Sequence, residues 1–159
     1  MRSRTFELIA SVGLVLAACT SPPATPMLID GPPSDLKASS AELFDQYGAA
    51  LSAPRPEALA GFYHYAGALR VFNGVRRAMT RAELDSIYRR SWNPPEYFAW
   101  EQLTYDSIAP RLVIVTGGFR WKSRGGRDTT RFLYTALLEA VDSGMTIRFE
   151  EETLRPPLR

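Results

Sequence analysis

The sequence predicts an α+β domain in which three helices pack on one face of a strongly curved antiparallel sheet. Apolar residues recur at helical spacing in the first half of the folded region, and the second half consists of long runs rich in β-branched and aromatic residues. Glycine pairs and short polar stretches punctuate these runs, which is typical of strands joined by tight turns. Helices followed by strands indicate a layered α+β architecture.

The first two helices are expected between residues 39 and 65. Ser39 and Glu42 have the spacing of a capping box, which places the start of the first helix at Ser39. Proline suits the first turn of a helix, so a second, short helix is expected from Pro56 to about Tyr65. The residues that recur at helical spacing in the first helix are Leu43, Phe44, Tyr47 and Leu51.

The third helix is expected to start at Thr80, because Thr80 and Glu83 form a second capping box. Pro94 and Pro95 end this helix, since proline lacks an N–H group and disfavours helical geometry in the preceding residue. The apolar residues on one face of this helix are Leu84, Ile87, Tyr88 and Trp92.

One short strand precedes the third helix and four long strands follow it. The short strand covers residues 68–72, and Asn73 and Gly74 form the turn after it. A turn signal from Asp142 to Gly144 separates the last two long strands. The long strands are expected over residues 97–105, 111–124, 127–141 and 145–153.

The N-terminal residues 1–18 have the pattern of an export signal. Basic residues open it, and an apolar stretch of about eleven residues follows, which is too short to span a bilayer. Residues 16–19, Leu-Ala-Ala-Cys, resemble the lipobox of bacterial lipoproteins, which implies cleavage before Cys19 and acylation of its thiol. An ordinary secretory leader with a spare cysteine and a cytoplasmic N-terminus are the alternatives. The resemblance predicts a lipid-anchored protein of the cell envelope, in the outer membrane if the cell has one.

Residues 19–37 are expected to form the lipidated cysteine and a proline-rich tether, and residues 38–157 the folded domain. The tether contains Pro22, Pro23, Pro26, Pro32 and Pro33 among small and polar residues, a composition that does not form a packed core. The whole chain has 159 residues, of which 45% are hydrophobic, so one core and one folded domain are expected.

Composition argues against several classes of partner. The net charge is +2, whereas a protein that neutralises phosphates needs a concentrated basic face. The single cysteine and single histidine exclude an internal disulfide and the usual zinc sites. We therefore expect no nucleic acid, metal or cofactor. Five arginines do gather, but Glu83 and Asp85 lie among them, which favours a solvated helix face: Arg76, Arg77, Arg81, Arg89 and Arg90.

The order of these elements resembles the nuclear transport factor 2-like (NTF2-like) superfamily, specifically its SnoaL-like and DUF4440-type bacterial members. The resemblance covers residues 39–156 and includes a short strand that ends in Phe72-Asn73-Gly74 and a closing strand after Gly144. It implies a cone-shaped cavity, open at one end between sheet and helices, in which small, mostly apolar molecules bind or react. In the closing strand the chain departs from the family pattern, with Met145, Phe149, Glu151 and Thr153 at positions where the family often has Trp, His, His and Ser.

An apolar pocket needs aromatic walls and a few polar groups that orient the ligand. His64 could act as a general base, or it could bind a carbonyl group at a helix end. Strand alternation places Glu151 on the more apolar face, where it could serve as an acid or base or form an ion pair with an arginine. Most of the aromatic residues could instead simply fill the core. The candidate pocket residues are Tyr47, Tyr63, His64, Tyr88, Trp100, Trp121, Tyr134, Phe149 and Glu151.

Both faces of the central strands are apolar. The helices can cover only one face of the sheet, so the other face would expose an apolar surface unless something packs against it. Members of the family often dimerise through the sheet, which suggests a homodimer. The C-terminal residues 154–159 or the tether could cover it instead. The inward set in the two central strands is Val113, Val115, Phe119, Trp121, Phe132, Tyr134 and Leu138, and the outward set is Leu112, Ile114, Leu133 and Leu137.

Three functions remain open from the sequence. The favoured one is a membrane-tethered domain that binds a small, mostly apolar molecule or a protein partner, because no convergent catalytic set is present. The second is a SnoaL-like isomerase, cyclase, dehydratase or hydrolase that works by acid and base catalysis with His64, Glu151 and a tyrosine. The third is a structural subunit of an envelope assembly that docks by its sheet.

Overall fold

A computed structural model describes residues 33–155 of the chain, with side chains from residue 36 onward. The predicted leader, Cys19 and most of the predicted tether lie outside the described residues, as do residues 156–159. The helices are α1 (Pro33–Ser52), the 3-10 helix η1 (Pro56–Phe62) and α2 (Arg81–Ser91). The strands are β1 (Ala68–Phe72), β2 (Val75–Met79), β3 (Tyr97–Ala109), β4 (Leu112–Lys122), β5 (Thr130–Val141) and β6 (Gly144–Leu154).

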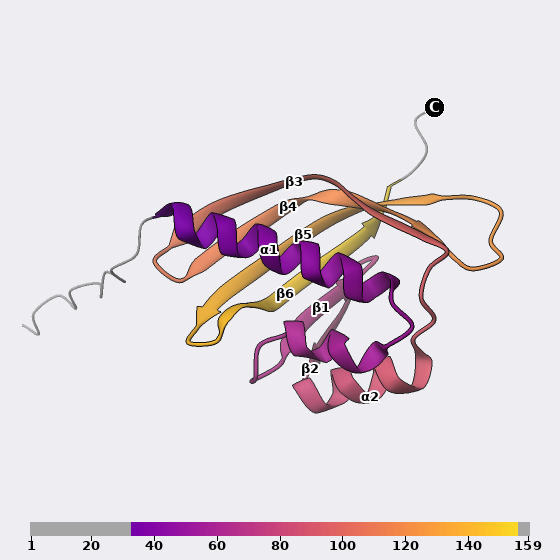
Figure 1. The fold of residues 1–159 in the computed structure, drawn as a ribbon, viewed down its shortest axis with the longest axis horizontal. Coiled ribbons are helices and arrows are strands. Elements are labelled where there is room, and N and C mark those ends of the chain that lie inside the picture. Colours follow the sequence, from indigo (N-terminus) through magenta and orange to yellow (C-terminus); the bar gives the residue numbers. More distant parts are fainter. Residues whose placement is uncertain (1–32, 156–159) are drawn as a thin grey trace, which may run out of the picture.

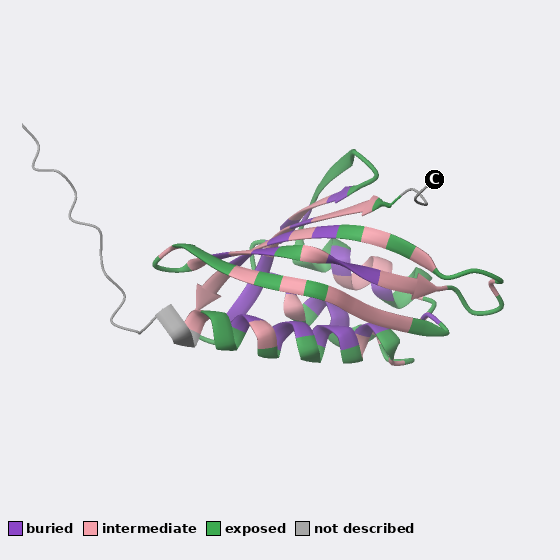
Figure 2. Cartoon of the chain, turned by 90° about the horizontal axis from the view of Figure 1, so that it is seen from above, coloured by how far each residue is buried: buried purple, intermediate pink, exposed green. Residues whose placement is uncertain are grey.

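The six strands form one sheet in the order β2-β1-β6-β5-β4-β3. All neighbours are antiparallel except β1 and β6, which run parallel, so the sheet is mixed. Figure 1 shows α1 lying across the long strands, with η1 and α2 gathered near β1 and β2. In Figure 2, α1 turns its buried residues toward the sheet and its exposed residues away from it. The predicted α+β architecture, with three helices against a curved sheet, is confirmed, but the sheet is mixed and not wholly antiparallel as expected.

The first helix begins earlier than predicted, at Pro33 instead of Ser39. Ser39 is exposed within the helix, so its capping-box spacing with Glu42 does not mark a helix start. Leu36, Lys37 and Ala38 are good helix formers, which lets the helix extend back to a proline suited to its first turn. The end of the predicted tether therefore belongs to the folded domain.

The other two helices follow their predicted signals closely. η1 begins at Pro56 but ends at Phe62, before the expected Tyr65. The capping box of α2 is formed, because the backbone N–H of Glu83 donates to Thr80 Oγ1 at 3.2 Å and the N–H of Thr80 donates to Glu83 Oε2 at 2.8 Å. Leu84 and Tyr88 of α2 are buried, as the spacing predicts.

Strand β2 was not predicted, and it corrects the interpretation of the arginine cluster. Asn73 and Gly74 have positive φ angles of 48° and 82°, which suits the two-residue turn of a β-hairpin. The chain therefore returns along β1 as an edge strand. Arg76 and Arg77 lie exposed on that strand instead of on a helix, whereas Arg81, Arg89 and Arg90 do belong to α2. The five residues form no single helix face.

A β-bulge at Arg148 sets the orientation of the last strand. Leu138 pairs with Ile147, but the next residue of β5, Leu137, pairs with Phe149, so Arg148 is the extra residue. After the bulge the alternation is reversed, because one inserted residue exchanges the two faces. The buried Glu150 pairs with Ala136 on the inner face, which the helices cover.

Candidate functional site

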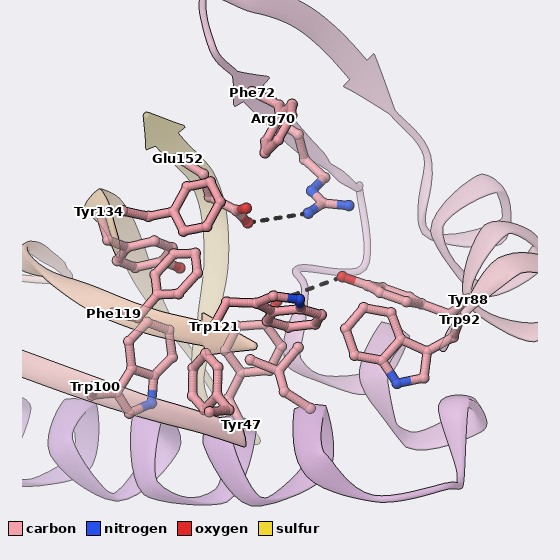
Figure 3. A pocket seen from close by; sticks show the side chains of 13 residues that line it. Tyr47, Arg70, Phe72, Tyr88, Trp92, Trp100, Phe119, Trp121, Tyr134 and Glu152 are labelled. Carbon is pink, nitrogen blue, oxygen red and sulfur yellow. Dashed lines mark hydrogen bonds and ion pairs between the residues drawn. The ribbon is translucent and has the colours of Figure 1, made fainter. Parts of the chain in front are cut away.

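A cavity of about 260 Å³ lies between the helices and the inner face of the sheet. Figure 3 shows its lining, in which α1, α2, β1 and the long strands all take part. Ten of the thirteen lining residues are aromatic: Tyr47, Phe72, Tyr88, Trp92, Phe98, Trp100, Phe119, Trp121, Phe132 and Tyr134. The other three are Leu51, Arg70 and Glu152. The cavity thus has apolar walls and a single pair of charged residues.

The aromatic walls are held by mutual packing and by a close approach of α1. The rings of Phe119 and Phe132 stack with their centroids 4.8 Å apart, and those of Trp92 and Trp121 meet edge to face at 5.7 Å. The indole N–H of Trp100 donates to the Phe44 carbonyl oxygen at 3.0 Å. These contacts fix the ring planes, so the cavity is a formed feature of the fold.

Behind the cavity, four tyrosine hydroxyl groups form a network around the buried carboxylate of Glu150, and two of them donate to it directly. Tyr63 donates to Glu150 Oε1 at 2.7 Å, so its only hydroxyl proton is committed. The hydroxyl groups of Tyr47 and Tyr88 each lie 2.8 Å from that of Tyr63, which makes them the donors in both bonds. Tyr134 donates to Glu150 Oε2 at 3.1 Å. The network satisfies a carboxylate that is only 1% exposed.

Burial raises the pKa of Tyr47, Tyr63, Tyr88 and Tyr134 above the ordinary range, and the charge of Glu150 raises each of them further. All four hydroxyl groups are therefore protonated at neutral pH. Since their protons point inward, toward Tyr63 or Glu150, the oxygens that face the cavity are hydrogen-bond acceptors.

Arg70 links Glu150 to the cavity. Its Nε forms an ion pair with Glu150 Oε1, and its Nη2 lies 3.4 Å from Glu152 Oε1. Burial alone would lower the pKa of Arg70, but the carboxylate of Glu150 outweighs this effect and raises it. The guanidinium also lies over the rings of Tyr63 and Tyr88, at 5.9 and 5.8 Å from their centroids. It is a permanent cation.

Glu152 is the carboxyl group in the lining of the cavity. Its side chain is 20% exposed, and the dashed line in Figure 3 marks its contact with Arg70. Burial and the neighbouring charge of Glu150 raise the pKa of Glu152 from 4.5 to about 7, against the opposing influence of Arg70. A carboxyl group with this pKa can give or take a proton at neutral pH.

Trp92 adds a second polar feature. Its indole Nε1 is buried and has no hydrogen-bond partner among the described residues, although the ring lines the cavity. An unpaired buried donor costs free energy unless a ligand or a water molecule accepts its hydrogen bond.

Comparisons with known proteins identify the fold. No family model and no curated protein matches the sequence. An NTF2-like protein of unknown function from Shewanella oneidensis has a similar structure, with a TM-score of 0.62, 15% identity, and 73% of this chain and 97% of that chain covered. The domain has the NTF2-like fold.

Two further solved structures are similar to this chain. A candidate calcium/calmodulin-dependent protein kinase II association domain from Xanthomonas campestris has a TM-score of 0.63 at 20% identity, with 79% of this chain and 93% of that chain covered. A candidate ketosteroid isomerase from Parabacteroides distasonis has a TM-score of 0.58 at 12% identity, with 85% and 96% covered. At such identities the likeness concerns the fold alone.

The NTF2-like fold brings together five of the residues predicted for the pocket, and it places a sixth directly behind them. The five that line the cavity are Tyr47, Tyr88, Trp100, Trp121 and Tyr134. Tyr63 lies beneath the cavity, where it holds the hydroxyl network. Arg70 and Glu152, the two charged residues of the lining, were not among the predicted pocket residues.

His64 lies outside the cavity lining. Its Nδ1 accepts a hydrogen bond from the backbone N–H of Ala66 at 3.1 Å, and Arg148 Nη1 lies 3.1 Å from the same atom. Burial and the charge of Arg148 lower the pKa of His64, and Glu139, 3.8 Å from Nε2, offsets this only in part. These contacts favour a structural role for this histidine, with the backbone N–H of Ala66 and Arg148 as partners instead of a carbonyl group at a helix end.

Glu151 and Phe149 also lie away from the cavity. They pair with Thr135 and Leu137 on the outer face, because the bulge at Arg148 reverses the alternation on which their placement was based. The prediction that Glu151 faces the apolar interior is wrong, and Glu150 and Glu152 occupy the inner positions instead.

Residues 33–155 contain no cluster of three or more metal-ligating side chains. No helix in this range is both long and apolar enough to cross a membrane.

Proposed function

We propose that this domain binds a small, mostly apolar molecule in the aromatic cavity. The observation that carries the proposal is the lining itself, ten aromatic residues around about 260 Å³ with charged groups at one end only. Aromatic walls supply affinity through burial, and a few polar groups fix the ligand's orientation. Arg70 and Glu152 are the groups that would orient it.

Intrinsic fluorescence tests this proposal directly, because all three tryptophans of the chain line the cavity: Trp92, Trp100 and Trp121. We expect a saturable change in tryptophan emission when the purified chain is titrated with small aromatic compounds. Phe132→Ala, which removes a ring from the wall, should weaken the affinity about tenfold. The matched control is Leu133→Ala, its neighbour on the outer face. Equal affinities in both variants, or no saturable change in the folded protein, would contradict the proposal.

Acid and base catalysis in the same cavity is the second candidate. The observation that favours it is the pKa of Glu152, about 7, next to a permanent cation. Glu152 would take a proton from the bound molecule, and Arg70 would stabilise the negative charge that develops. The fold neighbour described as a candidate ketosteroid isomerase agrees with this class of chemistry.

A conservative variant separates the two candidates. If the cavity is catalytic, Glu152→Gln should lower turnover at least about a hundredfold while the wild-type substrate still binds. Mass spectrometry of compounds that bind, incubated with wild-type protein and with Glu152→Gln, measures the conversion. Unchanged compounds in the wild-type incubation leave binding as the function.

We also propose that the domain is tethered to a membrane of the cell envelope through Cys19. The support is the Leu-Ala-Ala-Cys motif after a short apolar segment, in a chain with a single cysteine. Cells grown with labelled fatty acid should yield labelled wild-type protein, whereas Cys19→Ser should be unlabelled and leave the membrane fraction. Absence of label from the wild type would overturn the anchor.

A further inference from the structure

We propose that the cavity selects a positively charged ligand, an amine or quaternary ammonium group attached to a small apolar body. This inference rests on the proposed binding function and specifies the chemical class of the ligand. It follows from the balance of charges at the polar end of the cavity and from the rings that surround it.

The polar end contains more carboxylates than cations. Two carboxylates, those of Glu150 and Glu152, project from β6 onto the inner face, and Arg70 is the cation between them. The Nε of Arg70 is paired with Glu150, which also receives two tyrosine hydroxyl protons. Glu152 has only the longer contact of 3.4 Å to Arg70 Nη2 and faces the cavity. Two ionised carboxylates and one guanidinium therefore leave a net negative charge at this end of the cavity.

The environment already penalises that charge. Burial and the proximity of Glu150 raise the pKa of Glu152, which shows that a second anion here is unfavourable even with Arg70 nearby. An anionic ligand would add a third negative charge beside these two. A cationic ligand would reduce the electrostatic cost of ionised Glu152, because it would pair with the carboxylate and stabilise its charged form.

The walls also suit a cation. The electron-rich faces of tryptophan, tyrosine and phenylalanine attract cations within about 6 Å of the ring centroid. This arrangement already occurs at the polar end, where the guanidinium of Arg70 lies 5.8 Å from the centroid of Tyr88. Trp92 and Trp121 both line the cavity, and their rings meet edge to face. A methylated ammonium group fits such walls better than a strongly hydrated one, because it loses less hydration on entry.

A neutral ligand is the competing possibility. It could bind to protonated Glu152, whose carboxyl proton would be the donor to a carbonyl or hydroxyl oxygen. The tyrosine oxygens cannot help such an acceptor, since their protons are committed to Tyr63 and Glu150. A cation gains from both the carboxylate and the rings, so it should bind more tightly than a neutral molecule of the same shape.

Three molecules of nearly the same shape test the inference. Phenyltrimethylammonium is a cation, tert-butylbenzene is its neutral isostere, and benzenesulfonate is an anion of similar size. We expect tryptophan emission of the purified chain at pH 8 to report binding of phenyltrimethylammonium about tenfold tighter than tert-butylbenzene. Benzenesulfonate should bind more weakly than either.

Two variants on strand β6 test whether Glu152 is the source of the preference for a cation. Glu152→Gln should weaken phenyltrimethylammonium about tenfold and leave tert-butylbenzene unchanged. Glu151→Gln removes the same charge from the outer face and should change neither affinity. Tighter or equal binding of tert-butylbenzene or benzenesulfonate to the wild type would overturn the inference and leave the proposed binding function standing. Absence of saturable binding by all three compounds would overturn both.

Discussion

At the residue scale, the ionised form of Glu152 destabilises the folded protein. Its pKa in the fold is about 7, compared with 4.5 for an ordinary glutamate, so the folded state binds its proton more tightly than the unfolded state does. Removing that proton as the pH rises from about 4.5 to about 7 therefore destabilises the fold, by on the order of 2 to 3 kcal/mol when complete. An exposed glutamate would carry no such cost, which makes this position more suited to function than to stability.

Glu152→Gln should consequently stabilise the protein in a pH-dependent manner. At pH 8 the free energy of unfolding of the variant should exceed that of the wild type by on the order of 1 to 3 kcal/mol. At pH 5 this difference should largely vanish. Urea unfolding at the two pH values measures both differences. Glu151→Gln, with its side chain on the outer face, is the matched control. The same gain at both pH values would show that the cost is not one of ionisation.

Five of the ten aromatic residues that line the cavity were predicted as pocket residues from the sequence, whereas its charged end was not. Tyr47 and Tyr88 follow helical spacing, and Trp121 and Tyr134 follow strand alternation, so their periodicity points inward. Glu152 depends on the bulge at Arg148, and no glycine or proline in the sequence marks this bulge. Arg70 has an ordinary place in a short strand, and its role depends on the parallel pairing of β1 with β6. Both arise from contacts between distant segments.

At the element scale, the chain contains two segments with the Ser/Thr-x-x-Glu capping pattern, and only one of them caps a helix. Thr80 accepts the backbone N–H of Glu83 at the start of α2, whereas Ser39 lies inside α1. Helix formation by the residues that precede Ser39 decides the difference, because a cap requires the chain to leave helical geometry there. Correct capping matters for the cavity, since α2 holds Tyr88 and Trp92 against it.

Alanine substitution at these two positions should affect the free energy of unfolding differently. Thr80→Ala should lower the free energy of unfolding by about 1 kcal/mol, because one helix N–H loses its acceptor. Ser39→Ala should be neutral or slightly stabilising, since alanine is the better residue inside a helix. Chemical unfolding of the two variants under the same conditions compares them. A comparable loss in Ser39→Ala would mean that this serine does cap a helix in solution.

At the scale of the whole molecule, the helices cover one face of the sheet and leave the other open. Leu133 on this outer face is 49% exposed, and its neighbours on the same face include Leu137 and Ile114, which are half-buried. Glu101 with Arg120 and Arg131 forms ion pairs at 2.9 and 3.4 Å on this face, which places a charged margin beside the apolar strip. An apolar centre with a charged rim is the composition of a protein interface.

We expect this outer face to pair with the same face of a second copy. A two-fold contact would bury identical strips against each other, and a stable dimer needs about 800 Å² from each partner, which long strands such as β4 and β5 can supply. Leu133→Glu should therefore dissociate the dimer, because it places a charge within the apolar strip that the contact would bury. Val75→Glu is the matched control, since Val75 is 72% exposed on the edge strand β2, away from this strip. Sedimentation velocity of the wild type and both variants at micromolar concentration measures the result. A monomeric wild type would contradict this pairing.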